Sequence, residues 1–206
     1  MLTETYRPKT LEDIAGQEKA VKLLQNWSKA ADRGALIFHG PSGSGKTSAA
    51  YALARAVGVD PNGPDFARIE PSECSVSTVR ELDSKLHISA WGASGWRVWL
   101  IDEAHTMSAQ ARNRLLSLLE NLPRKRLIIL TTTEEEVFKN DPILFSRLLR
   151  VAFCKPHIDH ITALLKGIAL AETGNGAALP YERIIRDNRS NIRACIQALE
   201  VELLSA

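Results

Sequence analysis

Several features that mark other classes of protein are missing from this sequence. No apolar run approaches the ~18 residues needed to cross a bilayer, so a membrane-spanning protein is not expected. The opening residues, MLTETYRPKTLED, contain no apolar segment of the kind found in secretory signals, so export is not expected either. Repeats and low-complexity tracts are also missing, which argues against a repeat protein or a disordered chain.

Cysteine is scarce and poorly spaced for structural chemistry. The three cysteines, Cys74, Cys154 and Cys195, are odd in number, far apart and without CxxC spacing. A zinc site and a disulfide framework are therefore not expected, and a reducing, cytoplasmic location is predicted.

An excess of either charge is lacking too. The net charge is +2, with 24% charged residues, so the overall charge does not indicate nucleic-acid binding, although a local basic face remains open. The 206 residues, 45% of them hydrophobic, are sufficient for one domain or for a large and a small one.

Short apolar runs alternate with longer amphipathic segments, which predicts an α/β fold with a largely parallel sheet. Strands are predicted over residues 35–38, 66–69, 97–101, 127–130 and 149–153. Helices are predicted over residues 47–57, 77–86 and 108–122, then over 157–172, 181–187 and 191–204. The second group follows Pro156 without further strands, and Gly174, Gly176 and Pro180 interrupt it. We therefore predict an α/β domain over 1–155 and a small helical domain over 156–206.

A glycine-rich segment between the first strand and the first helix carries the strongest chemical signal. GPSGSGKT, residues 40–47, fits the phosphate-loop pattern in which backbone N–H groups surround the phosphates. Lys46 is expected to reach the β- and γ-phosphates, and the Thr47 hydroxyl to bind Mg²⁺. The alternative is a glycine-rich turn with a chance lysine. The predicted nucleotide contacts are Gly40, Pro41, Ser42, Gly43, Ser44, Gly45, Lys46, Thr47 and Ser48, with ATP and Mg²⁺ as the cofactors.

Two carboxylates follow the predicted strand 97–101. Asp102 is expected to hold the metal through water, and Glu103 to polarise an attacking water. Alone, such a pair is more often a solvated loop; beside a phosphate loop, it predicts hydrolysis. His105, which completes Asp-Glu-Ala-His, is assigned no catalytic role.

The N-terminal YRPKTLEDI, followed by Gly16-Gln17, resembles the signature of the clamp-loader branch of the AAA+ ATPases, that is, replication factor C small subunits and the bacterial tau/gamma subunit. IEPS from Ile69, VREL from Val79 and DEAHTMSAQARNRLLSLLENLP from Asp102 are similar to later segments of that family. The resemblance implies an AAA+ fold with a parallel five-stranded sheet and a helical lid. It also implies that Tyr6, Arg7 and Pro8 surround the adenine.

The same resemblance assigns roles to polar residues near the nucleotide. Thr131 and Thr132 end the strand where the family keeps a sensor of the γ-phosphate, and Thr132 is favoured, within one residue. Arg193, in Ser190–Ala194, resembles the family's second sensor. Arg147, in FSRL, stands where clamp loaders carry a Ser-Arg-Cys finger that acts in trans on the neighbouring subunit. The alternative for Arg147 is an ordinary solvent-exposed charge at a helix end.

The sequence also departs from the family pattern. It lacks the four-cysteine zinc module of tau/gamma proteins, so a replication factor C type or a phage or mobile-element relative is closer. Leu148 replaces the cysteine of Ser-Arg-Cys, and Ser117 stands where a basic, DNA-facing residue is usual. Candidate DNA contacts are Arg80, Lys85 and Arg112, each of which could equally be an exposed helix charge. The sequence stops at Ala206, after the expected lid, so the family's collar domain is expected to be absent, and the chain is either a fragment or a minimal loader that assembles by other contacts.

These features imply a Mg-dependent ATPase subunit that loads a sliding clamp onto primer–template DNA during replication. The expected partners are other AAA+ subunits in a homo- or hetero-oligomer, a pentameric spiral for example, together with the clamp and the DNA. The expected location is the cytoplasm, at the nucleoid, or the nucleus if the source is eukaryotic. One alternative is an AAA+ remodeller for recombination, helicase loading or mobile-element maintenance. Another is a non-hydrolysing scaffold, which would have no use for intact Lys46, Thr47, Asp102 and Glu103.

Overall fold

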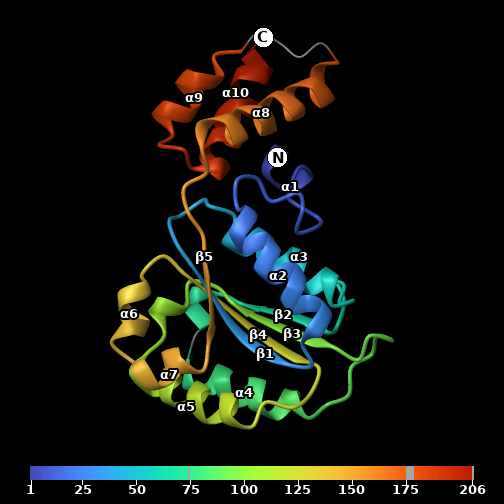
Figure 1. Cartoon of the computed structure of the whole chain (residues 1–206), viewed down its shortest axis with the longest axis vertical. Helices are drawn as coiled ribbons and strands as arrows, with labels where there is room; N and C mark the ends of the chain where they lie inside the picture. Colours follow the sequence, from blue (N-terminus) through green and yellow to red (C-terminus); the bar gives the residue numbers. More distant parts are fainter. Residues whose placement is uncertain (74, 175–178, 206) are drawn as a thin grey trace.

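The parallel five-stranded sheet expected from the sequence is present in the computed structural model, which describes residues 1–73, 75–174 and 179–205 (Figure 1). The strand order is β2-β3-β4-β1-β5, and every pairing is parallel. The strands are β1 (Gly34–His39), β2 (Phe66–Ile69), β3 (Arg97–Ile101), β4 (Arg126–Thr132) and β5 (Leu149–Ala152). Cys74 and Gly176 lie outside the described residues.

The register aligns the carboxyl ends of the central strands. His39 of β1 is paired with Thr132 of β4, and Ile101 of β3 is paired with Leu130. Because ligands of open α/β sheets bind beyond the carboxyl ends of the strands, the segments after His39 and Ile101 meet where a site is expected.

Side chains alternate between the two faces of the sheet, as the two-residue period of a strand requires. Leu36 and Phe38 belong to one core cluster, with residues of α2 and α3, whereas Ile37 belongs to the other, with residues of α4, α5 and α7. Both faces are therefore covered by helices, which explains why every residue of β3 and β4 is buried.

The helices agree with the predictions to within one or two residues at most ends, with one long helix added. The predicted helices correspond to α3 (Lys46–Ala56), α4 (Val76–Leu86), α5 (Ala109–Glu120), α8 (Ile158–Thr173), α9 (Tyr181–Asp187) and α10 (Ile192–Ser205). The added elements are α1 (Leu2–Thr5), α2 (Glu18–Ala30), α6 (Glu135–Lys139), α7 (Pro142–Ser146) and the 3₁₀ turns η1 (Pro71–Glu73) and η2 (Ala104–Thr106).

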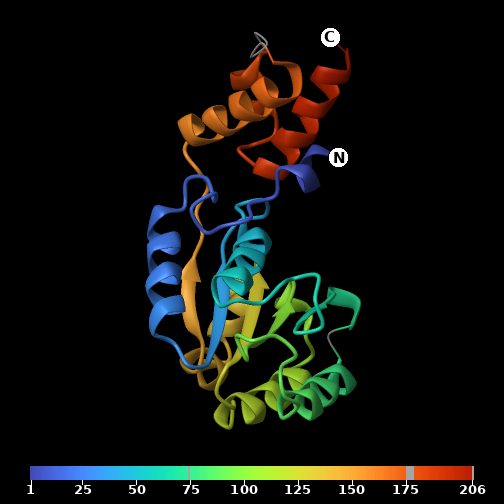
Figure 2. The same ribbon diagram turned by 90° about the vertical axis from the view of Figure 1, so that its right-hand side faces the viewer.

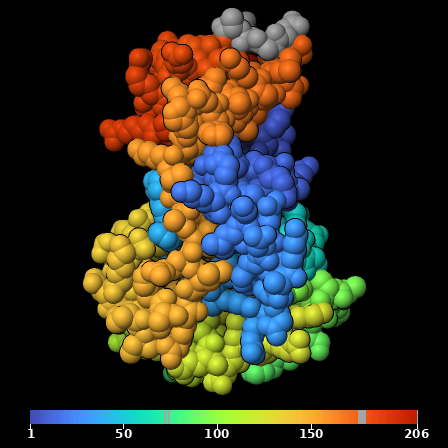
Figure 3. Space-filling view, viewed as in Figure 1, coloured from blue at the N-terminus to red at the C-terminus, as the bar shows by residue number. Residues whose placement is uncertain are grey.

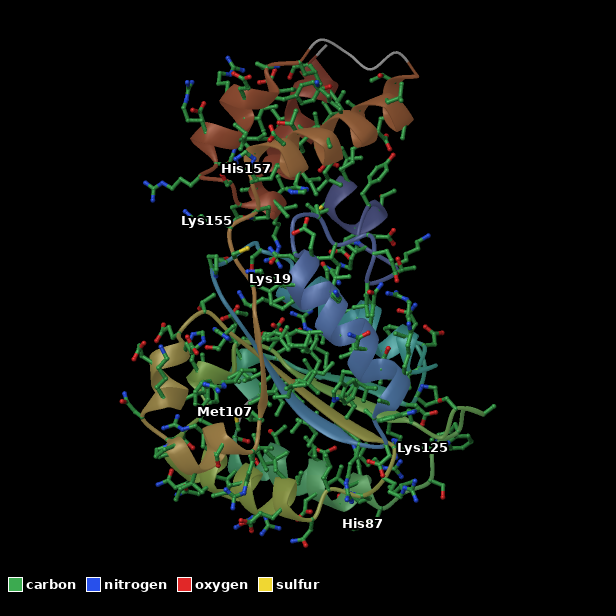
Figure 4. All side chains as sticks on the ribbon, viewed as in Figure 1. Lys19, His87, Met107, Lys125, Lys155 and His157 are labelled. Carbon is green, nitrogen blue, oxygen red and sulfur yellow. The ribbon has the colours of Figure 1, made fainter. Side chains whose placement is uncertain are left out.

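Helices α8–α10, here called the lid, form a third core cluster at the opposite end of the molecule from α4 and α5 (Figure 1). Lys155 and His157 mark the segment that joins β5 to this layer (Figure 4). The predicted domain boundary at 155/156 falls in the same segment and stays a prediction. Within the described part of the chain, none of the helices has the length and apolarity that a membrane span requires.

The N-terminal segment connects the lid to the sheet. Leu2 is buried in the lid cluster, and its backbone N–H donates a hydrogen bond to Glu200 Oε1 of α10 at 3.1 Å. Further along, Leu11 and Ile14 are buried in the sheet cluster that contains α2 and α3. The segment reaches the red end of the chain in Figure 2 and fills the waist of the molecule in Figure 3. The first fourteen residues therefore contribute side chains to two cores, the lid cluster and the sheet cluster that contains α2 and α3.

Candidate functional site

The phosphate loop joins the end of β1 to the start of α3. Gly40, Gly43 and Gly45 all have positive φ angles, of 143°, 71° and 98°, which side chains rarely adopt. A Cβ on Gly40 would also collide with the carbonyl oxygen of Phe153. The glycines therefore give the loop a shape that other residues would strain, with its backbone turned around the start of α3.

Lys46 is held inside this loop. Its ammonium group donates hydrogen bonds to the carbonyl oxygens of Gly40 and Pro41 at 2.8 and 2.9 Å, and the residue is 5% exposed. Burial lowers the pKa of Lys46, the nearby Arg193 acts in the same direction, and Glu103 and Asp102 oppose them. A buried cation whose charge is only partly balanced is suited to receive a phosphate.

Asp102 lies directly beyond β3 and is surrounded by donors. Thr131 Oγ1 donates a hydrogen bond to Oδ1 at 2.5 Å, and Thr47 Oγ1 donates to the same oxygen at 3.3 Å. Arg68 of β2 donates from Nη2 to Oδ2 at 2.6 Å. The carboxylate is thus buried, oriented and paired with one cation.

Asp102 and Thr47 fit the proposed magnesium ion. Mg²⁺ takes oxygen ligands and usually keeps several waters, with one or two protein ligands beside the phosphates of the substrate. The hydroxyl of Thr47 and the carboxylate of Asp102 provide such oxygens side by side at 3.3 Å. Among the described residues there is no group of three or more His, Cys, Asp or Glu that could hold a metal alone.

Glu103 turns toward the cavity through an unusual backbone conformation. Its φ is 48°, in the left-handed region, and its N–H donates to Thr131 Oγ1 at 3.0 Å. The carboxylate accepts a hydrogen bond from Thr133 Oγ1 at 3.3 Å and lies 3.4 Å from His105 Nδ1. Strain of this kind occurs at functional sites, where surrounding contacts maintain it.

The two threonines at the end of β4 have different surroundings. Both are fully buried, but Thr131 contacts Asp102 and the backbone of Glu103. The Thr132 hydroxyl lies 3.3 Å from His105 Nδ1 and accepts a hydrogen bond from the backbone N–H of Glu134. The sensor role assigned to Thr132 stays a prediction, and Thr131 is the threonine that touches the acidic pair.

A cavity of about 390 Å³ opens between the phosphate loop, the N-terminal segment and the lid. Most of the predicted nucleotide contacts line it, whereas Gly40, Pro41, Ser44, Asp102 and Thr132 do not. The predicted residues that line it are Tyr6, Arg7, Pro8, Ser42, Gly43, Gly45, Lys46, Thr47, Ser48, Glu103 and Arg193. The structure therefore brings residues from four separated parts of the sequence to one cavity.

Two of the predicted adenine contacts, Tyr6 and Arg7, are held by residues of α8 and α3. Tyr6 donates a hydrogen bond from its hydroxyl to Glu172 of α8 at 2.7 Å. The guanidinium of Arg7 lies over the ring of Tyr51, 5.2 Å from its centroid, and pairs with Glu4 at 2.6 Å. The wall of the cavity expected to receive the base thus depends on both the lid and α3.

Arg147 does not line this cavity. It follows α7, two residues before β5, and pairs with Glu120 of α5 at 2.8 Å. Since β1 and β5 are parallel, Arg147 lies at the amino edge of the sheet, and the phosphate loop lies beyond the carboxyl edge. An arginine at this edge is remote from the phosphate loop of its own chain.

The three candidate DNA contacts differ in availability. Arg80 is exposed on α4, and Lys85 pairs with Glu81 at 2.5 Å on the same helix. Arg112 instead donates from Nη1 to the carbonyl oxygen of Met107 at 2.6 Å, and its Nε is buried, 3.9 Å from Asp141. Arg112 is thus turned toward the protein, whereas Arg80 is free to contact a phosphate.

Besides Thr133, which bonds to Glu103, two further residues of the site have no role assigned from the sequence. Arg68 contacts Asp102, and the strand FARI contains no signal for that pairing. Gln17, 3% exposed, donates from Nε2 to the carbonyl oxygens of Ser44 and Cys154, at 3.2 and 2.7 Å. Its Oε1 accepts from the backbone N–H of Cys154 at 3.1 Å, so Gln17 ties the phosphate loop to the segment that leads to the lid.

Comparisons with known proteins agree with the resemblance read from the sequence. A family model described as DNA polymerase III, delta subunit, matches residues 59–155. DNA polymerase III subunit tau of Bacillus subtilis is 35% identical over 153 residues, which cover 65% of this chain and 27% of that protein. Replication factor C small subunit of Halobacterium salinarum is 27% identical over 198 residues, 96% of this chain and 61% of that protein.

Solved structures support the fold. The RuvB Holliday junction branch migration motor of Thermotoga maritima superposes with a TM-score of 0.76 at 21% identity, over 95% of this chain and 64% of that one. At this identity the likeness concerns the fold alone. The chain spans less than two thirds of the length of the curated relatives it matches.

Proposed function

This chain belongs to the clamp-loader branch of the AAA+ proteins, and we propose that it works there as a Mg-dependent ATPase subunit that loads a sliding clamp onto primer–template DNA. The proposal rests on one observation above the others. The phosphate loop, Glu103 and Arg193 face a single cavity between sheet and lid, with the Thr47–Asp102 pair beside it. A scaffold that only used the fold for assembly would not need this set.

Within the cavity each residue has a distinct task. Lys46 and the backbone of the loop would hold the phosphates, and Asp102 and Thr47 would hold the metal. Bound magnesium would offset negative charge on the phosphates in the transition state. Glu103 orients the attacking water and accepts its proton, with Thr133 and His105 fixing its carboxylate.

The lid reports whether the cavity is occupied. Arg193 stands on the first turn of α10 and faces the cavity, so its charge attracts the γ-phosphate when one is present. Binding would hold α10 against the loop, and the N-terminal segment would be held with the lid because Leu2 is part of the lid core. Nucleotide state would thereby set the angle between the two parts of the chain.

Arg147 completes a neighbour's site rather than its own. Its position at the amino edge of the sheet, away from its own phosphate loop, supports a role in trans. Its exposed guanidinium is held by Glu120 and the carbonyl oxygen of Ile143, which keep it ordered in the single chain. In a spiral of subunits, ATP at each interface would recruit the arginine of the next subunit, and DNA would trigger hydrolysis.

A phosphate-release assay tests the proposal directly. The chain, with its co-subunits if it has any, is assayed with ATP and Mg²⁺, alone and then with a sliding clamp and primed DNA. Turnover that requires Lys46 and rises with clamp and primed DNA together supports clamp loading. Turnover that ignores the clamp points to an AAA+ remodeller, and no turnover in the full assembly points to a scaffold. The mass of the native particle with ATP present shows whether an oligomer forms.

A further inference from the structure

Arg68 is bonded to the carboxylate that is expected to serve the metal. It is the third residue of β2, next to β3, and its Nη2 lies 2.6 Å from Asp102 Oδ2. The side chain of Asp102 is 8% exposed, whereas that of Arg68 is 35% exposed on the wall of the cavity. The contact is thus formed inside the site by a group that still has room to move.

The other carboxylate oxygen of Asp102, Oδ1, already accepts two hydrogen bonds. Oδ1 accepts hydrogen bonds from Thr131 and Thr47, so Oδ2 is the oxygen that remains for a cation, and Arg68 holds it. A buried carboxylate is stable when it is paired, and a guanidinium provides that pairing where a metal would otherwise do so.

Arg68 also has a second carboxylate within reach. Its Nε lies 3.2 Å from Oε1 of Glu70, the residue that follows the same strand, and the Glu70 side chain is 47% exposed. A small rotation about the side chain would break the contact with Asp102 and keep the one with Glu70. The guanidinium can therefore leave Asp102 without becoming an isolated charge.

We propose that Arg68 is a stand-in for the metal, and that it must release Asp102 before Mg²⁺ can bind there. Two cations at one carboxylate oxygen repel each other, so the two contacts are mutually exclusive. Arg68 would then be a positioning residue that orients Asp102 and weakens metal binding until ATP supplies further ligands. This inference rests on the proposed ATP site.

The test measures metal affinity rather than turnover. Mn²⁺ replaces Mg²⁺, and its binding to the nucleotide-free protein is followed by electron paramagnetic resonance in the wild type and in Arg68→Gln. We expect Arg68→Gln to bind Mn²⁺ about fivefold more tightly, the size of effect typical of one partly exposed ion pair. Adding Asp102→Asn should remove the gain. Arg114→Gln, which breaks a surface pair with Asp83, is the matched control and should change nothing.

The sign of the change decides between the possible roles. If Arg68 merely orients Asp102 for the metal, Arg68→Gln lowers or leaves unchanged the affinity for Mn²⁺, and the proposal is wrong. A second experiment measures the affinity of the wild type and of Arg68→Gln for a fluorescent ATP analogue, in EDTA and in Mg²⁺. Equal losses in both solutions would make Arg68 a phosphate ligand and would also overturn the proposal. No nucleotide binding by the wild type would instead refute the proposed function, and the Mn²⁺ result would still stand.

Discussion

The backbone N–H of Ile192 donates a hydrogen bond to the carbonyl oxygen of Gly43 at 3.2 Å, which joins the start of α10 to the middle of the phosphate loop. The side chain of Asn191 caps this helix end, since its Oδ1 accepts from the N–H of Ala194 at 3.1 Å. The same side chain occupies the space where a Cβ on Gly43 would stand. Loop and lid therefore contact each other through backbone atoms.

Gly43→Ala should separate the lid from the loop. The new Cβ would collide with Asn191, and φ at this position is 71°, so the substitution is strained on both counts. We expect a loss of about 1–3 kcal/mol in stability and weaker ATP binding. Thermal unfolding and nucleotide titration measure both. Gly167→Ala, in the open middle of α8, is the control and should be neutral or stabilising; equal effects of the two changes would contradict the contact.

Leu2→Ala should weaken the lid although it lies at the other end of the sequence. Leu2 is 9% exposed in the core of α8–α10, so truncation should cost about 2–3 kcal/mol, the lower part of the range for buried leucines. Hydrogen exchange should then rise in α10. The control is Leu204→Ala, the same substitution at a leucine of α10 that is 84% exposed, and it should have little effect. Unchanged exchange in α10 would mean that the N-terminal segment does not support the lid.

Glu103→Gln should stop hydrolysis and spare binding. The amide keeps the size of the side chain but cannot accept a proton from water, so turnover should fall roughly 10²–10⁴-fold. ATP affinity should stay close to that of the wild type because the phosphate contacts remain. The control is Glu134→Gln, a carboxylate 3.6 Å from the same His105 but outside the cavity. Turnover that survives in the Glu103 variant would remove the residue from the catalytic set.

His39 should make stability fall in mild acid. Burial lowers the pKa of His39 below its ordinary 6.5, Lys139, Arg150 and Lys46 act in the same direction, and Glu135 opposes them. Between the lowered pKa and 6.5 the unfolded chain binds more protons, so the free energy of unfolding rises with pH through this window. The stabilisation is present above 6.5 and is lost as pH falls through the lowered pKa.

The measurement is urea unfolding between pH 7.5 and 5.5 in the wild type and in His39→Asn. The variant should lose less stability on acidification, because one group that protonates mainly in the unfolded state is gone. His87→Asn changes an exposed histidine at the end of the molecule away from the lid and should keep the wild-type slope (Figure 4). Parallel pH curves for all three proteins would refute the assignment.

The apolar runs were sufficient to predict the sheet, although the strands differ in burial. Every residue of β3 and β4 is buried, whereas at the edge strand β5 only Val151 is buried. α2 was not predicted, although EKAVKLLQNWSKA has apolar residues at helical spacing: Ala20, Leu23, Leu24 and Trp27 stand at i, i+3, i+4 and i+7, and all lie in or against the sheet cluster. Residues 135–139 and 142–146 were missed because each helix is only five residues long.

The candidate site was predictable where a short motif imposes a backbone shape. The glycines around Lys46 and the acidic pair after β3 are local signals, and the structure brings them together as expected. Contacts across strands leave no local trace, which is why Arg68 was missed and why sequence could not separate Thr131 from Thr132. The burial of Leu2 in the lid is likewise a long-range contact, spanning 198 residues to Glu200.

The central claim, that Arg147 serves the site of a neighbour, is tested most directly by mixing two inactive variants. Arg147→Ala keeps an intact ATP site and should bind ATP normally, yet lose roughly 10³–10⁵-fold in stimulated hydrolysis. Glu103→Gln has an inactive ATP site but keeps Arg147. In a homo-oligomer with head-to-tail interfaces, about a quarter of the interfaces in an equal mixture combine a functional ATP site with an intact Arg147. The mixture should therefore recover about a quarter of wild-type turnover. A mixture as inactive as its components would contradict the account.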